Sequence, residues 1–256
     1  MCTVVIRVPE SDDESTRVLA IRDEDPTRPW NPLGRWWPEP HDGVIGVRDA
    51  RAGGAWLAAH PETGRLAVLL NRADVSTRPE AELVSRGGLV LASVTGRSPS
   101  ADPATHGFNL LEVAGARARV LSWDGAGLRT TELAPGTHMI AHDDVDDPAT
   151  PRIARWLEDF RAAHPEGGER WFAPWTRVLA LSADLPPTDD RAIVRDNRPH
   201  GYPTLSLLAC VASVSSDAVD VRYGELAGPG QWGAGLDLVR PAATPSTSDA
   251  TRSWSR

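Results

Sequence analysis

Short apolar runs recur along most of the chain, and Gly, Pro, Asn, Asp or Ser residues separate them. Runs of this kind, bounded by turn residues, are typical of β-strands. The turn-forming segments 61–64 and 124–127 indicate that neighbouring runs are joined as hairpins. The pattern therefore predicts mostly antiparallel strands at residues 2–8, 17–22, 44–48, 55–60, 65–71, 108–113, 117–123, 128–132, 137–141, 204–213 and 218–223.

Helical spacing of apolar residues is clearest at residues 151–164, where Ile153, Trp156, Leu157 and Phe160 share one face and charges fill the other. A second helix is expected at 175–182, and a short one at 80–85 within the mixed stretch 79–94. Strands and helices together favour a single α+β domain over residues 1–240 with helices packed on the sheet faces. The Ser-, Thr-, Ala- and Pro-rich tail at 241–256 is expected to be disordered.

Residues 24–43 are rich in proline and tryptophan. Proline donates no backbone hydrogen bond and restricts the residue before it, so this stretch should form neither a regular helix nor a central strand. Trp30, Trp36 and Trp37 either wall an apolar pocket or pack beneath the loop, and packing is the preferred interpretation.

Composition narrows the class of protein. The net charge of −8 argues against a general nucleic-acid binder, which normally carries a clustered basic face. The two cysteines are far apart, and the N-terminus lacks a secretory leader, which predicts a reduced, cytoplasmic protein. No apolar run is long enough to span a membrane, so membrane insertion is not expected. Oligomeric state is left open by these features.

Cys2 is the candidate for chemistry at the start of the chain. Removal of Met1 would leave Cys2 with a thiol nucleophile and a free α-amine, and an α-amine titrates at about 7.7–8.0, so it can accept a proton near neutral pH. The alternative interpretation is that Cys2 is a small buried hydrophobic residue.

The first two predicted strands form a hairpin about the acidic loop 9–15. In the expected register Ile6 faces Leu19 and Cys2 comes opposite Asp23, whereas a slip of one residue puts Arg22 beside Cys2. Arginine can stabilise a thiolate or an oxyanion, and a carboxylate can orient the α-ammonium or a substrate amide. Alternatively, Arg22 and Asp23 are polar residues that leave a strand.

Two further pairs of polar residues need interpretation. His138 and His142 precede an acidic run, but in a strand their imidazoles would lie about 13 Å apart, so no metal site is expected. Asn71 ends one apolar strand and Asn109 lies just inside another, where a side-chain amide can reach a pocket or tie backbone groups together.

Several short motifs occur in one order along the chain, up to about Tyr223. They are Met1-Cys2, Arg22-Asp23-Glu24, Arg28-Pro29, Gly53-Gly54-Ala55-Trp56-Leu57, Asn71, Gly107-Phe108-Asn109-Leu110, Pro135-Gly136-Thr137 and Tyr202-Pro203-Thr204-Leu205-Ser206. Together they resemble the motifs of the NRDE proteins, also called the transport and Golgi organisation family. Two positions depart from the family pattern: Ile21 stands in place of the signature Asn, and His142 stands where members often have Asn.

The resemblance implies a fold and a site. NRDE proteins look similar to N-terminal nucleophile hydrolases of the penicillin V acylase and bile salt hydrolase kind, which implies an αββα sandwich with mostly antiparallel sheets. The implied activity is that of an amidohydrolase or acyltransferase acting on a small linear amide. The implied catalytic residues are Cys2, Arg22 and Asp23, with Asn71 or Asn109 as donor to the oxyanion, and the substrate contacts are expected from Trp30, Trp56 and Thr204.

The alternative is a non-enzymatic protein of the same fold that binds or transports a small ligand. Relatives have been linked to secretory-pathway organisation and to the handling of haem or lipid metabolites. The enzyme hypothesis requires no cofactor, whereas haem is a candidate ligand under the alternative, with Cys2 as a ligand or a structural residue.

Overall fold

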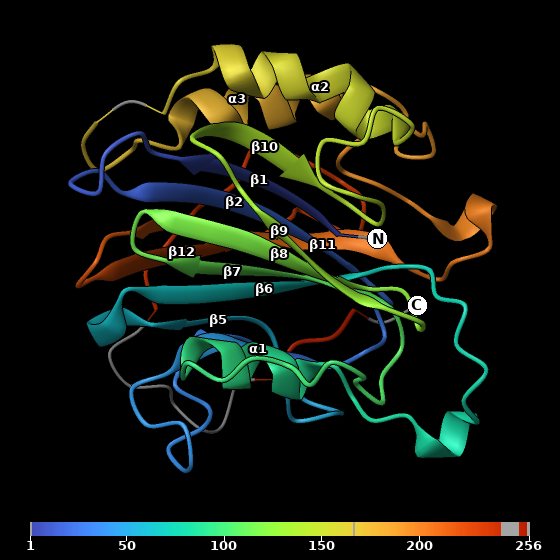
Figure 1. Ribbon diagram of the computed structural model, residues 1–256. Coiled ribbons are helices and arrows are strands. Elements are labelled where there is room, and N and C mark those ends of the chain that lie inside the picture. Colours follow the sequence, from blue (N-terminus) through green and yellow to red (C-terminus); the bar gives the residue numbers. More distant parts are fainter. Residues whose placement is uncertain (1, 166, 242–250, 255–256) are drawn as a thin grey trace.

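The computed structural model describes residues 2–165, 167–241 and 251–254, and these residues form four layers. Two antiparallel β-sheets lie face to face in the middle, and helices cover both outer faces (Figure 1). The described chain is therefore an αββα sandwich, which confirms the fold class expected from the sequence.

The first sheet has the strand order β10-β1-β2-β11-β12, and its neighbouring strands pair antiparallel. It joins the start of the chain to segments from its middle and end. Its strands are β1 (Thr3–Val8), β2 (Thr16–Glu24), β10 (Gly136–Ile140), β11 (Leu205–Val214) and β12 (Val219–Glu225).

The second sheet keeps its strands in chain order, from β3 to β9, as expected for a series of hairpins. Its strands are β3 (Trp30–Gly34), β4 (Ile45–Asp49), β5 (Ala55–His60), β6 (Arg65–Asn71), β7 (Phe108–Ala114), β8 (Arg117–Trp123) and β9 (Leu128–Glu132).

Each layer boundary is an apolar core. Val4 and Ile6 of β1 face the second sheet, whereas Val5 between them faces the helices, as the two-residue period of a strand requires. Helices α2 (Pro151–Ala162) and α3 (Ala173–Ser182) cover the first sheet, and α1 (Gly87–Val94) covers the second through its own apolar residues. The strands of the first sheet are thus buried on both faces.

The β1–β2 register differs by one residue from the one expected. Ile6 pairs with Val18 rather than Leu19, and Thr3 pairs with Ile21, so the slipped register is the one observed. Apolar residues occupy both faces of these strands, so a slip of one residue only moves side chains from one apolar core to the other. The hydrophobic pattern therefore cannot distinguish the two registers.

Two elements differ from those predicted. The segment expected to hold a short helix at 80–85 contains only a 3-10 turn, Glu80–Glu82, and the α-helix begins later, at Gly87. Gly87 and Gly88 at its start made this helix hard to predict, because glycine disfavours helix formation. The proline-rich stretch contains β3, which is an edge strand, the position in a sheet that tolerates Pro32.

The tail predicted to be disordered, 241–256, lies mostly outside the described residues. Its described part pairs with β3: Arg252 N–H donates to the Trp30 carbonyl at 2.7 Å, and Trp30 N–H donates to the Arg252 carbonyl at 2.9 Å. Residues 251–254 therefore extend the edge of the second sheet.

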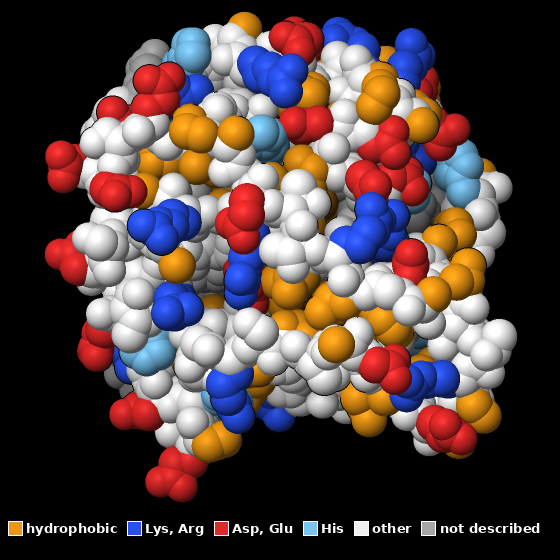
Figure 2. Space-filling view, in the orientation of Figure 1, with side chains coloured by type: hydrophobic (Ala, Val, Ile, Leu, Met, Phe, Trp, Pro, Cys, Tyr) orange, Lys and Arg blue, Asp and Glu red, His pale blue; other side chains and the backbone are white. Residues whose placement is uncertain are grey.

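The described helices are too short or too polar to cross a membrane. On the face seen in Figure 2, acidic and basic side chains are interspersed, and apolar side chains show between them.

Candidate functional site

A cavity of about 150 Å³ opens where the N-terminal end of β1, the C-terminal end of β2 and the N-terminus of α1 meet. Five of the residues expected at a site from the sequence line it: Cys2, Arg22, Asp23, Asn71 and Trp56. The hairpin carries the first three, and β6 and β5 carry the other two. The remaining lining residues are Glu24, Arg28, Asp49, Ala55, Leu69, Ser85, Arg86 and Gly87.

The Cys2 side chain is buried, with 5% of the residue exposed, and its sulfur contacts the backbone of Asp23. The Asp23 N–H donates to Sγ at 3.4 Å, and Sγ lies 3.7 Å from the Asp23 carbonyl oxygen, which it can donate to. Burial raises the pKa of the Cys2 thiol above its ordinary value, and the nearby Asp23 carboxylate raises it further. In this environment the resting sulfur is a thiol, and a base would be needed to make it a nucleophile.

Cys210 provides a comparison within the same chain. Both cysteines are free and buried, and burial raises the pKa of Cys210 as well. Cys210, however, lies in the middle of β11 within the core between the sheets, whereas Cys2 lines the cavity. Only Cys2 therefore combines a thiol with access to a ligand-sized space.

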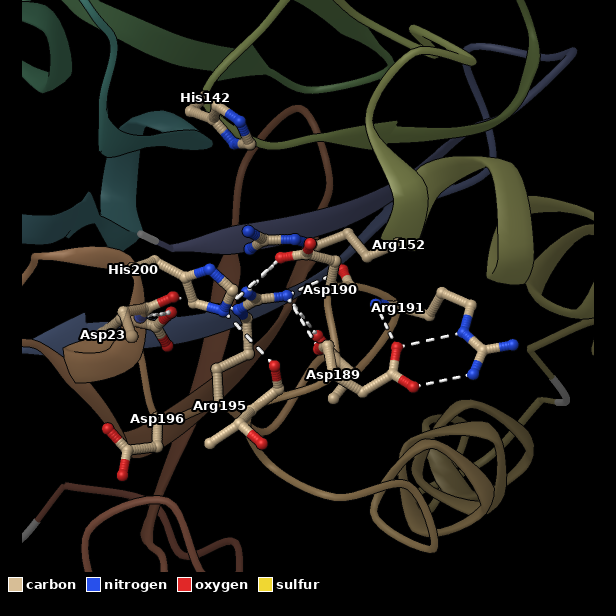
Figure 3. A network of polar contacts seen from close by, with 12 residues as sticks. Asp23, His142, Arg152, Asp189, Asp190, Arg191, Arg195, Asp196 and His200 are labelled. Carbon is tan, nitrogen blue, oxygen red and sulfur yellow. Dashed lines mark hydrogen bonds and ion pairs between the residues drawn. The ribbon is translucent and has the colours of Figure 1, made fainter.

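The Asp23 carboxylate is held by two neutral donors from distant parts of the chain. Ser206 Oγ, directly across the β2–β11 pair, donates to Oδ1 at 2.6 Å, and Asn197 Nδ2 donates to Oδ2 at 3.2 Å. Arg195 Nε in turn donates to Asn197 Oδ1 at 2.9 Å, and the rest of its guanidinium binds the 189–192 loop (Figure 3). These contacts fix the orientation of the carboxylate beside Cys2.

Charged side chains alternate along the cavity wall. Arg22 Nη2 lies 3.4 Å from Glu24 Oε2, Glu24 lies 4.0 Å from Arg28, and Arg28 Nη2 lies 2.6 Å from Asp49 Oδ2. Among the residues that the structure describes, Arg22 Nη1 is buried and has no hydrogen-bond partner. One edge of this guanidinium is therefore anchored and the other is left for an acceptor.

Arg152 of α2 is a buried cation near the site. It was not among the site residues predicted from the sequence. Its Nη1 donates at 3.0 Å to the hydroxyl of Thr3, the residue after Cys2. Burial and the neighbouring Arg195 lower the pKa of Arg152 to about 10, although Asp23 and Cys2 oppose the shift. Arg152 lies one turn before Trp156, on the apolar side of the helix, and a charge at that position was the available signal.

The other predicted site residues lie outside the cavity lining. Asn109 is fully buried, and its amide donates to the carbonyls of Ala141 at 3.1 Å and Asp143 at 2.7 Å, while its Oδ1 accepts from Ser122. Its side chain therefore ties β7 to the loop after β10.

Two aromatic or hydroxyl residues expected to contact substrate are likewise used elsewhere. The Trp30 indole packs between the sheets and donates to the Tyr223 hydroxyl at 3.0 Å. The Thr204 hydroxyl accepts from the Asn197 amide at 3.1 Å, and the same amide donates to the Asp23 carboxylate. Thr204 is therefore linked to Asp23 through Asn197. Trp56 alone of the three lines the cavity.

The two histidines considered for a metal have separate partners. His138 lies 2.8 Å from Asp146, and His142 lies 3.2 Å from Asp143, with burial lowering the pKa of His142. Within the described ranges, no three residues of the His, Cys, Asp and Glu types form a group that could hold a metal ion.

A wider cavity, of about 320 Å³, lies at the other end of α1, and it is lined by Arg65, Arg97 and Glu112 among others. Its lining residues include neither a cysteine nor a histidine. We therefore place the candidate chemistry in the smaller cavity, where the candidate nucleophile Cys2 lies beside Arg22 and Asp23.

The molecule is thus an αββα sandwich with a cysteine at the start of a central strand, beside an arginine and an aspartate on the paired strand. Residues 1–170 match the model of the family described as transport and Golgi organisation 2, and the chain belongs to this family. The resemblance seen in the sequence motifs is confirmed over this range.

No curated protein matches the chain. Among solved structures the chain is similar to the Caenorhabditis elegans N-acylethanolamine-hydrolyzing acid amidase (NAAA) ortholog, with a TM-score of 0.47 and 13% sequence identity over 82% of this chain and 92% of that chain.

Proposed function

We propose that the protein, after removal of Met1, is a cysteine N-terminal nucleophile amidohydrolase or acyltransferase acting on a small linear amide. One observation carries the proposal: the Cys2 sulfur lines a cavity together with Arg22 and a firmly held Asp23 carboxylate. A nucleophile, a cation and an oriented anion around one small cavity are the parts that acyl transfer requires.

The first half-reaction acylates the sulfur. The α-amine of Cys2 accepts the thiol proton as Sγ attacks the amide carbonyl carbon, which forms a C–S bond and a tetrahedral oxyanion. The intermediate collapses, the C–N bond breaks, and the α-ammonium gives its proton to the departing amine. A thioester on Cys2 and a free amine remain. The raised pKa of Cys2 fits this scheme, because the sulfur begins as a thiol that needs a base.

The second half-reaction releases the acyl group. Water attacks the thioester carbonyl while the α-amine accepts one of its protons, and the C–S bond breaks to give the carboxylic acid and the Cys2 thiol. If an amine attacks instead of water, the same steps give a new amide and the protein is an acyltransferase.

Two side chains of the cavity are assigned to the oxyanion. Asn71 is exposed at the cavity and can donate from its amide, whereas the amide of Asn109 is occupied by backbone carbonyls. Arg22 adds positive charge next to the sulfur. Donors placed where negative charge develops are worth about 10²–10³-fold in rate each.

Asp23 is proposed to orient the α-ammonium and the substrate amide. Its carboxylate accepts from Ser206 and Asn197, and these two contacts fix its orientation. The ligand-binding alternative is less well supported, because a cavity of about 150 Å³ with an ionic lining fits a small polar group better than a haem or a lipid.

Mass spectrometry of the purified protein tests the proposal. We expect Met1 to be absent and a thiol-directed electrophile to label Cys2 in preference to Cys210. A Cys210→Ala variant should label like the wild type, whereas Cys2→Ala should not be labelled at the N-terminal peptide. Retention of Met1, or labelling of Cys210 with Cys2 unreacted, would overturn the mechanism.

A further inference from the structure

Arg86 is the arginine of the cavity that pairs with no carboxylate in the described structure. It lies immediately before α1, and its Nη1 donates to the neutral carbonyl oxygen of Gly107 at 2.6 Å. The other two arginines of the lining, Arg22 and Arg28, are paired with Glu24 and Asp49. The charge of Arg86 is therefore the one that the cavity leaves without a counter-ion in contact.

Burial makes this charge costly. It lowers the pKa of Arg86 and outweighs the opposing influence of the more distant Glu24 and Asp74 carboxylates. A partly buried cation is stabilised when an anion comes within hydrogen-bond distance. A ligand that brings such an anion would gain the interaction that the protein itself does not supply.

The cavity wall also has a surplus of buried donors. Arg22 Nη1 and Trp56 Nε1 belong to lining residues that are at least nine-tenths buried, and neither atom has a hydrogen-bond partner among the described residues. Such orphaned donors in a folded protein call for an acceptor from a ligand or water.

The carboxylates of the lining already have donors. Ser206 and Asn197 bind Asp23, and Arg28 binds Asp49. Glu24 lies near Arg22 and Arg28 and accepts from the Asp25 N–H at 3.0 Å. The carboxylates of the wall therefore have partners, whereas Arg22 Nη1 and Trp56 Nε1 have none among the described residues.

The start of α1 adds to the same region. Gly87, its first residue, lines the cavity, and it lies so close to Gly54 that a Cβ on Gly54 would come 2.6 Å from the Gly87 Cα. This contact holds the helix N-terminus against the turn before β5. The partial positive charge at a helix N-terminus favours an anion.

We propose that the substrate carries a carboxylate, and that Arg86 at the start of α1 binds it while the amide carbonyl meets Cys2. This rests on the proposed function and narrows it to small amides with an acidic group. The volume of about 150 Å³ is that of a cavity that holds a benzene-sized ligand, which favours a short acyl portion over a long hydrocarbon chain.

Alkylation of Cys2 by a matched pair of reagents tests the anion site. Iodoacetate carries a carboxylate where iodoacetamide carries a neutral amide. Peptide mapping measures the rate of alkylation at Cys2 separately from that at Cys210. We expect Arg86→Gln to slow iodoacetate about tenfold, the effect of losing one charged hydrogen bond, and to leave iodoacetamide nearly unchanged. Arg97→Gln, an exposed arginine just after the same helix, should change neither rate.

The neutral reagent is also the control for folding. If Arg86→Gln slows both reagents alike, or leaves the ratio of their rates as in the wild type, the anion site is refuted. With glutaryl and acetyl anilides as substrates, the same variant should raise KM for the glutaryl compound more than for the acetyl compound.

Failure of this inference is distinguishable from failure of the proposed function. A Cys2 that forms acyl thioesters with neutral amides, with no dependence on Arg86, refutes the carboxylate specificity and leaves the enzyme proposal standing. A reagent preference that depends on Arg86, in a protein that never forms a thioester, supports the anion site and refutes the enzyme proposal.

Discussion

Residues of the same type have different roles in this molecule because they lie in different surroundings. Cys2 and Cys210 are both buried thiols, yet of the two only Cys2 lines the cavity. The site residues on the first hairpin were predictable, because the two strands are adjacent in sequence and bring Cys2 near Arg22 and Asp23 in either register. Arg86 was not, because it reaches the site through long-range packing, which leaves no local pattern. Ser206 belongs to one of the matching motifs, but its contact with Asp23 joins strands that are far apart in sequence and was not predicted.

Asn71 and Asn109 give a matched pair of variants. Asn109→Ala removes the partner of two carbonyls and the Ser122 hydroxyl, so we expect a loss of about 1–3 kcal/mol in the free energy of unfolding. Asn71→Ala, at an exposed position, should change that free energy by less than about 0.5 kcal/mol but lower acyl transfer about 10²–10³-fold. Urea denaturation and steady-state kinetics measure the two effects. If Asn109→Ala lost as much activity as Asn71→Ala and kept the wild-type free energy of unfolding, the oxyanion role of Asn71 and the structural role of Asn109 would be contradicted.

At the scale of elements, strand existence was easier to predict than register or helix position. The β1–β2 hairpin was expected, but both of its faces are apolar, so the pattern left the register ambiguous by one residue. The glycine-rich start of α1 disguised the helix that closes the cavity, although Gly87 is needed there for its contact with Gly54. Local propensity was overruled by packing in this element.

The stabilisation that the His138–Asp146 pair gives to the link between β10 and the loop after it should depend on pH. Hydrogen bonding to Asp146 raises the pKa of His138, and Asp146 also accepts from the Met139 N–H and contacts Arg161. Because the folded pKa exceeds the unfolded value of about 6.5, the stabilisation is full below that pH and is lost as pH rises through the folded pKa.

We therefore expect His138→Gln to lower the free energy of unfolding more at about pH 5.5 than at about pH 8.5. Urea denaturation at the two pH values measures the difference. His164→Gln, at an exposed position just after α2, provides the control for replacing a surface histidine. An equal effect of His138→Gln at both pH values would show that the ion pair with Asp146 contributes nothing.

At the scale of the whole molecule, the sandwich explains why the site lies where it does. The two sheets share one core, and the candidate nucleophile Cys2 directly precedes β1, a strand that is buried on both faces, so its position is fixed by packing from both sides. The order of motifs predicted the family and the layered fold. Pairing of the first sheet, which joins β1 to β10 and β2 to β11, was beyond prediction because these partners are far apart in sequence.

The central claim is that the Cys2 sulfur becomes acylated by an amide. Acid-quenched mass spectrometry of the protein mixed with acetyl and glutaryl p-nitroanilides tests it most directly. We predict one hydroxylamine-labile acyl group on Cys2 of the chain that lacks Met1, formed with release of one nitroaniline and absent in Cys2→Ala. Nitroaniline release without an adduct on Cys2, an adduct only elsewhere, or no reaction with either compound would contradict the claim.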